Sequence, residues 1–277
     1  MAEITASKVN ELRARTGLGM MKCKELLTAT GGDVEKAIDE ARKQGVKASI
    51  TARATSEGRV NVAVSADGKT GAILEINANT DFTAKSEPIA QLMSQALQSL
   101  LKNPAANPSE DTDLKAKVTA VAQQTGENIH FGRFAVISAP NGQVAAYRYT
   151  ITGKIAVLMA FEGGKPSDEL VTDLGGHIAF SKPLGLDRSA IPADIVAKER
   201  EIAVEQAKAT GKPQQIAEKI AEGKLNAFFK ERTLLDQDFF NAQKFTGTIA
   251  DLLKKNGLTM TKDVRLELGQ PYELSYR

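Results

Sequence analysis

The side chains with the clearest chemical potential lie between Glu75 and Glu87. An apolar stretch around Leu74 predicts a short buried strand, which runs out into a polar loop where Asp81 precedes Phe82. A carboxylate beside a phenyl ring at the end of a strand could bind a partner, because loops on a rigid scaffold often carry function. A structural alternative is open from these residues alone, in which Asp81 caps the next helix and Phe82 folds back onto the core.

The sequence contains none of the common motifs for making or breaking bonds. Gly223-Lys224 lacks the first glycine and the final Ser/Thr of a phosphate-binding loop. Gly17-Leu-Gly19 lacks the third glycine of a dinucleotide fingerprint, and no strand is predicted before it. Neither Gly-x-Ser-x-Gly nor His-Glu-x-x-His occurs. The missing motifs therefore argue against an enzyme, and we expect no cofactor and no nucleotide bound by the chain itself.

The composition argues against several further classes of site. Lys and Arg number 36 against 34 Asp and Glu, a net charge of +2, so no broad positive field favours direct binding of nucleic acid. The single cysteine, Cys23, excludes a disulfide framework, and the two histidines, His130 and His177, have no metal-ligand spacing. The apolar run Ile155–Phe161 has the length of a strand rather than of a membrane span. With no basic, hydrophobic leader before Ile4, we expect a cytoplasmic protein without membrane contact.

Residues 1–45 predict a module of three short helices. Capping residues and glycines divide the segment, and each helix has an apolar stripe. The loop between the first two helices ends in Met20 and Met21. Methionine side chains adapt readily to a partner's surface but also fill cores, so both roles are open for this pair. The small, polar and basic residues 46–57 predict a linker.

Residues 58–131 and 132–191 predict two related units of sheet and helix. Each unit has alternating strands around a hairpin signal, Asp67-Gly68 in the first and Asn141-Gly142 in the second. An amphipathic helix follows the strands in both units. The similarity is one of pattern, because residue identities hardly repeat.

The last part of the chain has a different sequence pattern. Residues 192–232 predict two helices with narrow apolar seams, which form an antiparallel hairpin projecting from the sheets. Residues 233–277 predict a helix and a strand that complete the second unit. The predicted fold class is therefore α+β, with a three-helix module, two units with antiparallel sheets and a helical hairpin.

Two runs of residues match the signatures of one family. Ile4–Lys24 closely resembles the amino-terminal signature of bacterial elongation factor Ts, and Asn79–Lys85 is similar to the second signature of that family. Shorter motifs follow in the family's order: Gly126-Glu-Asn-Ile129, Ser181-Lys-Pro183, Gly211-Lys-Pro213, Ile220-Ala-Glu-Gly-Lys224 and Val264-Arg-Leu-Glu-Leu-Gly269. The resemblance spans the whole chain, and two signatures in order are far more specific than one.

The resemblance implies a guanine-nucleotide exchange factor that binds elongation factor Tu in its GDP-bound and nucleotide-free states. In the family, a loop tip disturbs the Mg²⁺ site and switch region of the GTPase. The amino-terminal module, similar to ubiquitin-associated domains, docks on the nucleotide-binding domain, and the second unit reaches a further domain. These roles carry over to Thr80, Asp81, Phe82 and Thr83 at the tip, to Val9, Arg13, Met20 and Met21 in the module, and to Ile129 and Tyr149 for the second unit.

On this resemblance, Phe82 is expected to be exposed and functional. Thr83 departs from the apolar residue usual in the family, and Tyr149 from a frequent histidine. Two other classes of function remain open. One is an adaptor, similar to ubiquitin-associated domains, that binds proteins without exchange activity, which leaves residues 58–277 without a role. The other is an enzyme with a pocket between the two units, against which the missing motifs argue.

Overall fold

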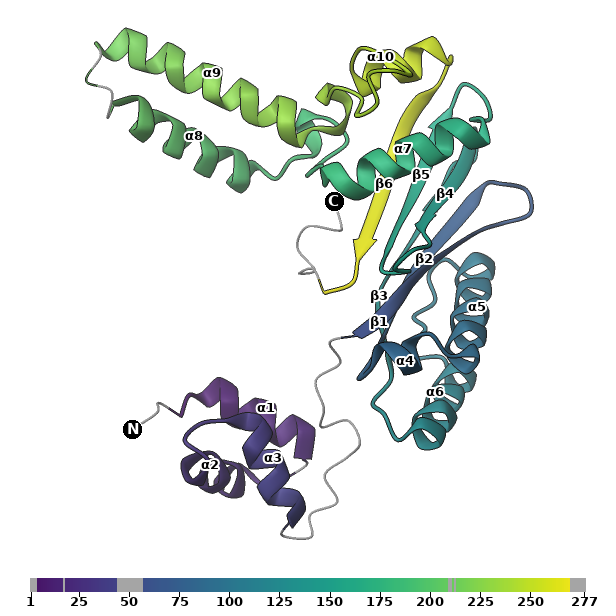
Figure 1. Ribbon diagram of the computed structural model, residues 1–277, viewed down its shortest axis with the longest axis vertical. Helices are drawn as coiled ribbons and strands as arrows, with labels where there is room; N and C mark the ends of the chain where they lie inside the picture. The colour runs from purple at the N-terminus through teal and green to yellow at the C-terminus, as the bar shows by residue number, and fades with distance from the viewer. Residues whose placement is uncertain (1–3, 17, 44–56, 209–210, 212, 270–277) are drawn as a thin grey trace. The chain divides into compact units, whose positions relative to one another are not determined.

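The computed structural model describes residues 4–16, 18–43, 57–208, 211 and 213–269 (Figure 1). The helices before the second sheet are α1 (Ala6–Thr16), α2 (Met20–Ala29), α3 (Val34–Lys43), α4 (Asp81–Ala84), α5 (Glu87–Lys102) and α6 (Thr112–Thr125). The helices that follow β5 in the chain are α7 (Asp168–Ser181), α8 (Ala193–Lys208), α9 (Gln214–Arg232) and α10 (Ile249–Lys255). Two short 3-10 helices, η2 (Arg188–Ala190) and η3 (Leu234–Asp236), lie between them. The first sheet contains β1 (Glu57–Val64), β2 (Thr70–Ala78) and β3 (His130–Ser138), and the second contains β4 (Gln143–Tyr149), β5 (Ile155–Glu162) and β6 (Thr259–Glu267). Two antiparallel three-stranded sheets with helices confirm the predicted α+β class.

By compactness the chain divides into two units. Met1–Arg59, Ile76–Ala96 and Ala106–Gly132 form the first, and Val60–Glu75, Leu97–Ala105 and Arg133–Arg277 form the second. The strands of the first sheet therefore contribute residues to both units.

The amino-terminal helices α1, α2 and α3 share a core of their own. Its buried residues include Leu12, Cys23 and Leu27, one or more from each of the first two helices, and Ile38 from α3. The Asp33 carboxylate caps α3 by accepting a hydrogen bond from Lys36 N at 3.1 Å. Most of the predicted linker, residues 46–56, lies outside the described residues.

The first sheet has the strand order β1-β2-β3. The hairpin predicted at Asp67-Gly68 forms between β1 and β2: Gly68 has a left-handed φ of 68°, and Asp67 Oδ1 accepts a hydrogen bond from Lys69 N at 2.9 Å. The second predicted hairpin is wrong, because β3 belongs to the first sheet and β4 to the second. Asn141-Gly142 does form a turn, in which Gly142 N donates to Ala139 O at 3.0 Å. The chain changes sheets at that turn.

Hydrogen bonds from the β1–β2 turn explain this change of sheet. Ala139 N donates to Lys69 O at 2.8 Å, and Val144 N donates to Gly68 O at 2.7 Å. Backbone groups on both sides of the second turn thus bond to the first turn instead of to each other. A turn signal specifies that the chain bends, and does not specify which strand the next segment joins.

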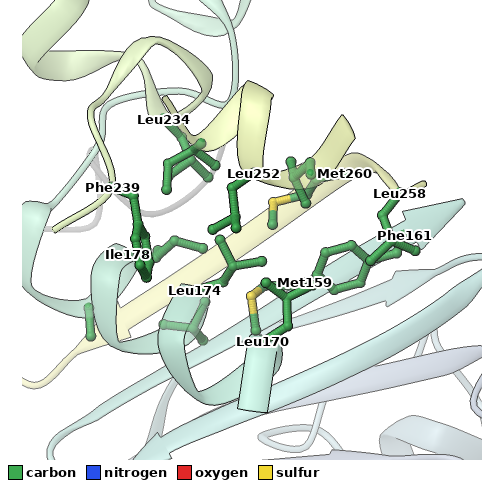
Figure 2. Packing of buried hydrophobic residues seen from close by; sticks show 14 of the residues in the cluster. Met159, Phe161, Leu170, Leu174, Ile178, Leu234, Phe239, Leu252, Leu258 and Met260 are labelled. Atoms are coloured by element: carbon green, nitrogen blue, oxygen red, sulfur yellow. The ribbon is translucent and has the colours of Figure 1, made fainter. Parts of the chain in front are cut away.

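β5 is the central strand of the second sheet, and both of its pairings are antiparallel. It is buried from Ile155 to Phe161 because each face meets a hydrophobic core. Its odd-numbered side chains pack with Leu174 of α7 and Leu252 of α10 (Figure 2). Its even-numbered side chains pack with Ile73 and Ile137 of the first sheet. The uninterrupted apolar run is a strand, as its length predicts, and the structure covers it on both faces.

β6, the strand predicted within residues 233–277, begins at Thr259. Apart from the buried Met260, its first half is polar and largely exposed, so it lacks the sustained apolar alternation that predicts a strand from sequence. The pairing with β5 is also irregular between Ala160 and Phe161. The apolar and polar spacing of the sequence therefore does not predict the first half of this strand.

Helices α8 and α9 lie side by side, as predicted for residues 192–232 (Figure 1). The fully buried residues of their contact are small, Ala203 and Ala207 on α8 with Ala217 and Ala221 on α9, and the partly buried Val204 and Ile220 pack against them. Alanine lets two helix backbones approach closely while burying little apolar surface. The projection of this pair from the sheets stays a prediction.

A buried ion pair connects β2 and β3. Arg133 Nε donates to Glu75 Oε2 at 3.2 Å, and each side chain is 8% exposed. Arg133 Nη2 also donates to Glu267 O at the end of β6, so one guanidinium links the two sheets. The carboxylate of Glu75, which opens the chemically promising stretch, is therefore committed to the fold.

His177 of α7 is a buried histidine, 4% exposed. Its Nε2 lies 2.8 Å from Gln237 Oε1, which also accepts a hydrogen bond from Ser181 Oγ at 2.9 Å. Gln237 Nε2 donates to Glu231 O at 2.6 Å, so its oxygen faces the imidazole and Nε2 of His177 carries the hydrogen. Burial lowers the pKa of His177, and the hydrogen bond to Gln237 opposes this only in part.

Replacing His177 with glutamine should reduce the loss of stability that His177 causes as the pH falls. An unfolded histidine has a pKa of about 6.5, and the folded value is lower, so the unfolded state takes up the proton first and stability falls as the pH drops below about 6.5. Burial raises the pKa of Asp263 to about 6, which acts in the opposite sense, so the difference between the two proteins isolates His177. Urea unfolding at about pH 7.5 and 5.5 measures this difference. An identical pH dependence in the variant would contradict the assignment.

Candidate functional site

The loop tip after β2 is a single helical turn, α4. Thr80 is its N-cap: the backbone is extended there, with φ −128° and ψ 151°, and Thr80 Oγ1 accepts a hydrogen bond from Thr83 N at 3.2 Å. The alternative in which Asp81 caps this helix is therefore wrong. Asp81 is instead the first residue inside the turn.

Phe82 is 87% exposed, whereas Thr83 and Ala84 beside it are 5% and 3% exposed. The alternative in which the phenyl ring folds back onto the core is wrong. A phenyl ring left in water forgoes roughly 1.5–3 kcal/mol of burial free energy, so contacts of the neighbouring residues must maintain this conformation. Exposed on a loop tip that a rigid scaffold positions, the ring is available to contact another protein.

Asp81 is paired with two cations of its own chain. Its Oδ1 lies 3.0 Å from Arg59 Nη2, and its Oδ2 lies 2.7 Å from Lys85 Nζ. The hydrogen bond from Lys85, followed by that from Arg59, lowers the pKa of Asp81 against the opposing effect of burial. The ionised carboxylate thus ties the start of the turn to β1 and to the residue that follows the turn.

Glu127 makes the most extensive contact with the tip. Its Oε2 accepts hydrogen bonds from Asn79 N at 3.1 Å and Thr80 N at 3.0 Å, and its Oε1 accepts from Thr80 Oγ1 at 2.6 Å and Thr83 Oγ1 at 2.8 Å. Burial disfavours the charged form, but the hydrogen bonds from Thr80 and Thr83 outweigh it and lower the pKa of Glu127. Asn128 N adds a hydrogen bond to Asn79 Oδ1 at 2.7 Å.

Local sequence patterns do not single out Glu127. It follows Gly126, whose left-handed φ of 69° ends α6, and it lies 47 residues from Thr80 in the chain. The motif Gly126-Glu-Asn-Ile129 was the one signal that pointed to it, as part of the family resemblance. Ile129 of the same motif is 4% exposed, so its side chain does not lie on the surface as a partner contact would.

The structure separates the four docking residues predicted in the amino-terminal module. Met20 and Met21 are 55% and 82% exposed at the start of α2, and Arg13 is exposed on α1. Val9 is 7% exposed and belongs to the module's core. The accessible part of the predicted docking surface therefore consists of Arg13, Met20 and Met21.

Tyr149 is half-buried at the end of β4. Its ring meets Phe180 of α7 edge-on, with 5.1 Å between the centroids. Phe180 and Ile151 are 57% and 79% exposed, so the second unit presents an apolar surface around Tyr149. The sequence did not distinguish Phe180 from the core residues of its amphipathic helix.

Among the described residues, no group of three acidic, histidine or cysteine side chains is placed to hold a metal ion. Within the same part of the chain, no helix combines the length and the apolar character needed to cross a membrane. His130 is exposed at the start of β3, and Cys23 is buried in the amino-terminal module.

Several known proteins are similar to this chain in amino-acid sequence. The model of the family described as elongation factor TS matches residues 79–270, which include the tip, Glu127 and Tyr149. The chain is 39% identical to elongation factor Ts of Methylococcus capsulatus over 98% of this chain and 94% of that protein. It is 44% identical to the Azoarcus protein of that name, over 99% and 93%, and 40% identical to that of Photorhabdus laumondii, over 99% and 95%. These matches extend across the amino-terminal module as well, and the chain belongs to the elongation factor Ts family.

Proposed function

We propose that this chain accelerates GDP release from elongation factor Tu by disturbing the Mg²⁺ site and switch region of the bound GTPase. Membership of the elongation factor Ts family implies the coarser activity, nucleotide exchange on elongation factor Tu in translation elongation. The observation that carries the finer proposal is the exposure of Phe82, 87%, on a turn whose flanking residues are held by hydrogen bonds.

The Phe82 ring acts as a wedge in this proposal. Mg²⁺ bridges the phosphate oxygens of a bound nucleotide and neutralises their charge, so displacing its water or carboxylate partners removes much of the nucleotide's affinity. A phenyl ring inserted between packed elements of the GTPase can cause that displacement without a catalytic base. Asp81 is already paired with Arg59 and Lys85, so we assign it first to shaping the tip.

Exchange also requires that the factor leave. Coupling between two ligands is reciprocal, so a factor that weakens GDP binding is itself bound less tightly when GDP is present. Arg13, Met20 and Met21 would dock on the nucleotide-binding domain, and the surface around Tyr149 on a further domain. Because Val9 and Ile129 are buried, their part in binding would be indirect.

Release of a fluorescent GDP from elongation factor Tu of the same organism tests the proposal. Small amounts of the factor should accelerate release many times over, because each molecule turns over. Binding to elongation factor Tu with an unchanged release rate would favour the adaptor without exchange activity. Absence of both binding and acceleration would reject both functions.

The factor alone should bind neither GDP nor GTP. Its sequence lacks the Gly-x-x-x-x-Gly-Lys-Ser/Thr motif of a phosphate-binding loop, and the proposed mechanism needs none. Calorimetric titration of the factor with each nucleotide should give no heat of binding, beside a positive control with elongation factor Tu. Micromolar binding of either nucleotide by the factor would contradict this expectation.

A further inference from the structure

We infer that Glu127 is the positioning residue that keeps Phe82 presented for nucleotide exchange. The inference rests on the proposed function and assigns a role to a residue outside the tip itself. Glu127 acts through Asn79, Thr80 and Thr83, which lie on both sides of Phe82 in the chain.

The chemistry of the donors explains why a carboxylate is needed at this position. Asn79 and Thr80 each present a backbone N–H, and Thr80 and Thr83 each present a hydroxyl, with donor-acceptor distances from 2.6 to 3.1 Å. All four groups donate here: the two backbone N–H groups can only donate, and the two hydroxyls direct their hydrogens to the other oxygen. An ionised carboxylate accepts on both oxygens, whereas an amide accepts on one and donates from the other end.

Glu127 also orients the group that caps the turn. The single hydroxyl hydrogen of Thr80 points to Glu127, which leaves the lone pairs of Thr80 Oγ1 to accept from Thr83 N at 3.2 Å. The hydroxyl of Thr83 returns to the same carboxylate oxygen, Oε1. This closed set of hydrogen bonds fixes the backbone on both sides of Phe82, so the turn holds its conformation while the ring stays in water.

The same arrangement accounts for Thr83, which stands where the family resemblance leads one to expect an apolar residue. Its side chain is buried, 5% exposed, and its hydroxyl donates a hydrogen bond to Glu127 Oε1. The hydroxyl is therefore used within the chain and not for a partner. A valine would fill the same volume but would leave one acceptor site on Glu127 without its donor.

Glu127→Gln tests the inference in the full-length factor. With its NH₂ group toward Asn79 N and Thr80 N, the glutamine amide loses both of those hydrogen bonds. With its NH₂ group toward Thr80 Oγ1 and Thr83 Oγ1, the two hydroxyls must turn to accept, so their hydrogens lose the carboxylate and the negative charge is gone. We expect the maximal rate of GDP release at saturating factor to fall roughly tenfold, and the concentration for half-saturation to change much less, because the docking module is intact. Thr83→Val should have a smaller effect of roughly threefold. Glu222→Gln, at an exposed position of α9, is the matched control and should leave the rate unchanged.

A double variant separates positioning from general stability. If Glu127 acts through the ring, Glu127→Gln should have little further effect on release in a protein that already carries Phe82→Ala. Independent losses that add in the double variant would overturn the inference. A lower melting temperature with an unchanged maximal rate would also overturn it, because Glu127 would then only stabilise the protein.

Hydrogen exchange of the Thr83 amide in the free factor provides a readout independent of activity. It should be faster in Glu127→Gln than in the wild type, because the capping hydroxyl loses its orientation. If the wild-type factor did not accelerate GDP release from elongation factor Tu, the proposed function would be rejected. Faster exchange of the Thr83 amide in Glu127→Gln would still support the role of Glu127 in holding the tip. An active wild type with an equally active and equally protected variant would reject this inference alone.

Discussion

Replacing Phe82 with alanine should slow GDP release from elongation factor Tu by roughly tenfold or more at saturating factor. Removing a phenyl ring from an interface costs on the order of 1.5–3 kcal/mol by area, and each 1.4 kcal/mol of lost coupling is a factor of ten in rate. The complex without nucleotide should still form through the module and the surface around Tyr149. The variant should therefore bind while discriminating less against the GDP-bound state.

The same substitution should barely change the stability of the free factor, because Phe82 is 87% exposed and supports no core. Stopped-flow GDP release and a thermal melt of the free factor measure the two effects separately. Ile216→Ala is a suitable control, since Ile216 is also an exposed apolar residue, 46%, but lies on α9. A wild-type release rate with a lowered melting temperature would place Phe82 in the core and remove the proposed wedge.

Deleting residues 1–45 should weaken binding to elongation factor Tu by roughly a hundredfold or more and leave the remainder folded. Met20 and Met21 are exposed in the free factor, and burying two such side chains is worth about 3–6 kcal/mol by area, against about 2.7 kcal/mol for a hundredfold change in affinity. The buried cluster of the module consists of its own residues, including Leu12 and Leu27, so its removal should open no cavity elsewhere.

A double substitution in the full chain provides the matched control. Met20→Gln with Met21→Gln keeps the module but removes the adaptable apolar surface, so it should reproduce most of the loss of affinity. Titration against nucleotide-free elongation factor Tu and urea unfolding of each variant give the two measurements. If the truncated protein lost its cooperative unfolding, the module would be part of the core. If it bound as tightly as the full chain, the docking role would be lost.

Most secondary elements were predictable where one burial pattern covers a whole element. β5 is apolar along its length because a core covers each face, and the helix of residues 87–102 buries one stripe, Ile89, Leu92, Met93, Ala96, Leu97 and Leu100, as its spacing predicts. The turn at Asp67-Gly68 needs a left-handed residue, which glycine provides without strain. In each case, neighbours in sequence determine the outcome.

What sequence patterning missed depends on contacts between distant segments. Asn141-Gly142 bends the chain, but hydrogen bonds to Gly68 and Lys69 decide which sheet the next strand joins. Glu127 reaches Thr80 across 47 residues, so no local spacing could reveal it. The exposure of Phe82 was expected only from the family resemblance, since on composition alone an isolated phenylalanine is more often buried.

The alanine contact between α8 and α9 has a consequence for how the molecule opens. Four buried alanines contribute about 3 kcal/mol of apolar burial in total, at roughly 0.8 kcal/mol for each methyl-sized group, and Val204 and Ile220 add only part of a fully buried side chain each. This core is small beside those that cover the two faces of β5. The two helices can therefore separate or fray while the sheets and their cores stay intact. We expect proteolytic cleavage and amide hydrogen exchange to be faster in α8 and α9 than in β5. A side chain larger than alanine at Ala207 would push the two helix backbones apart.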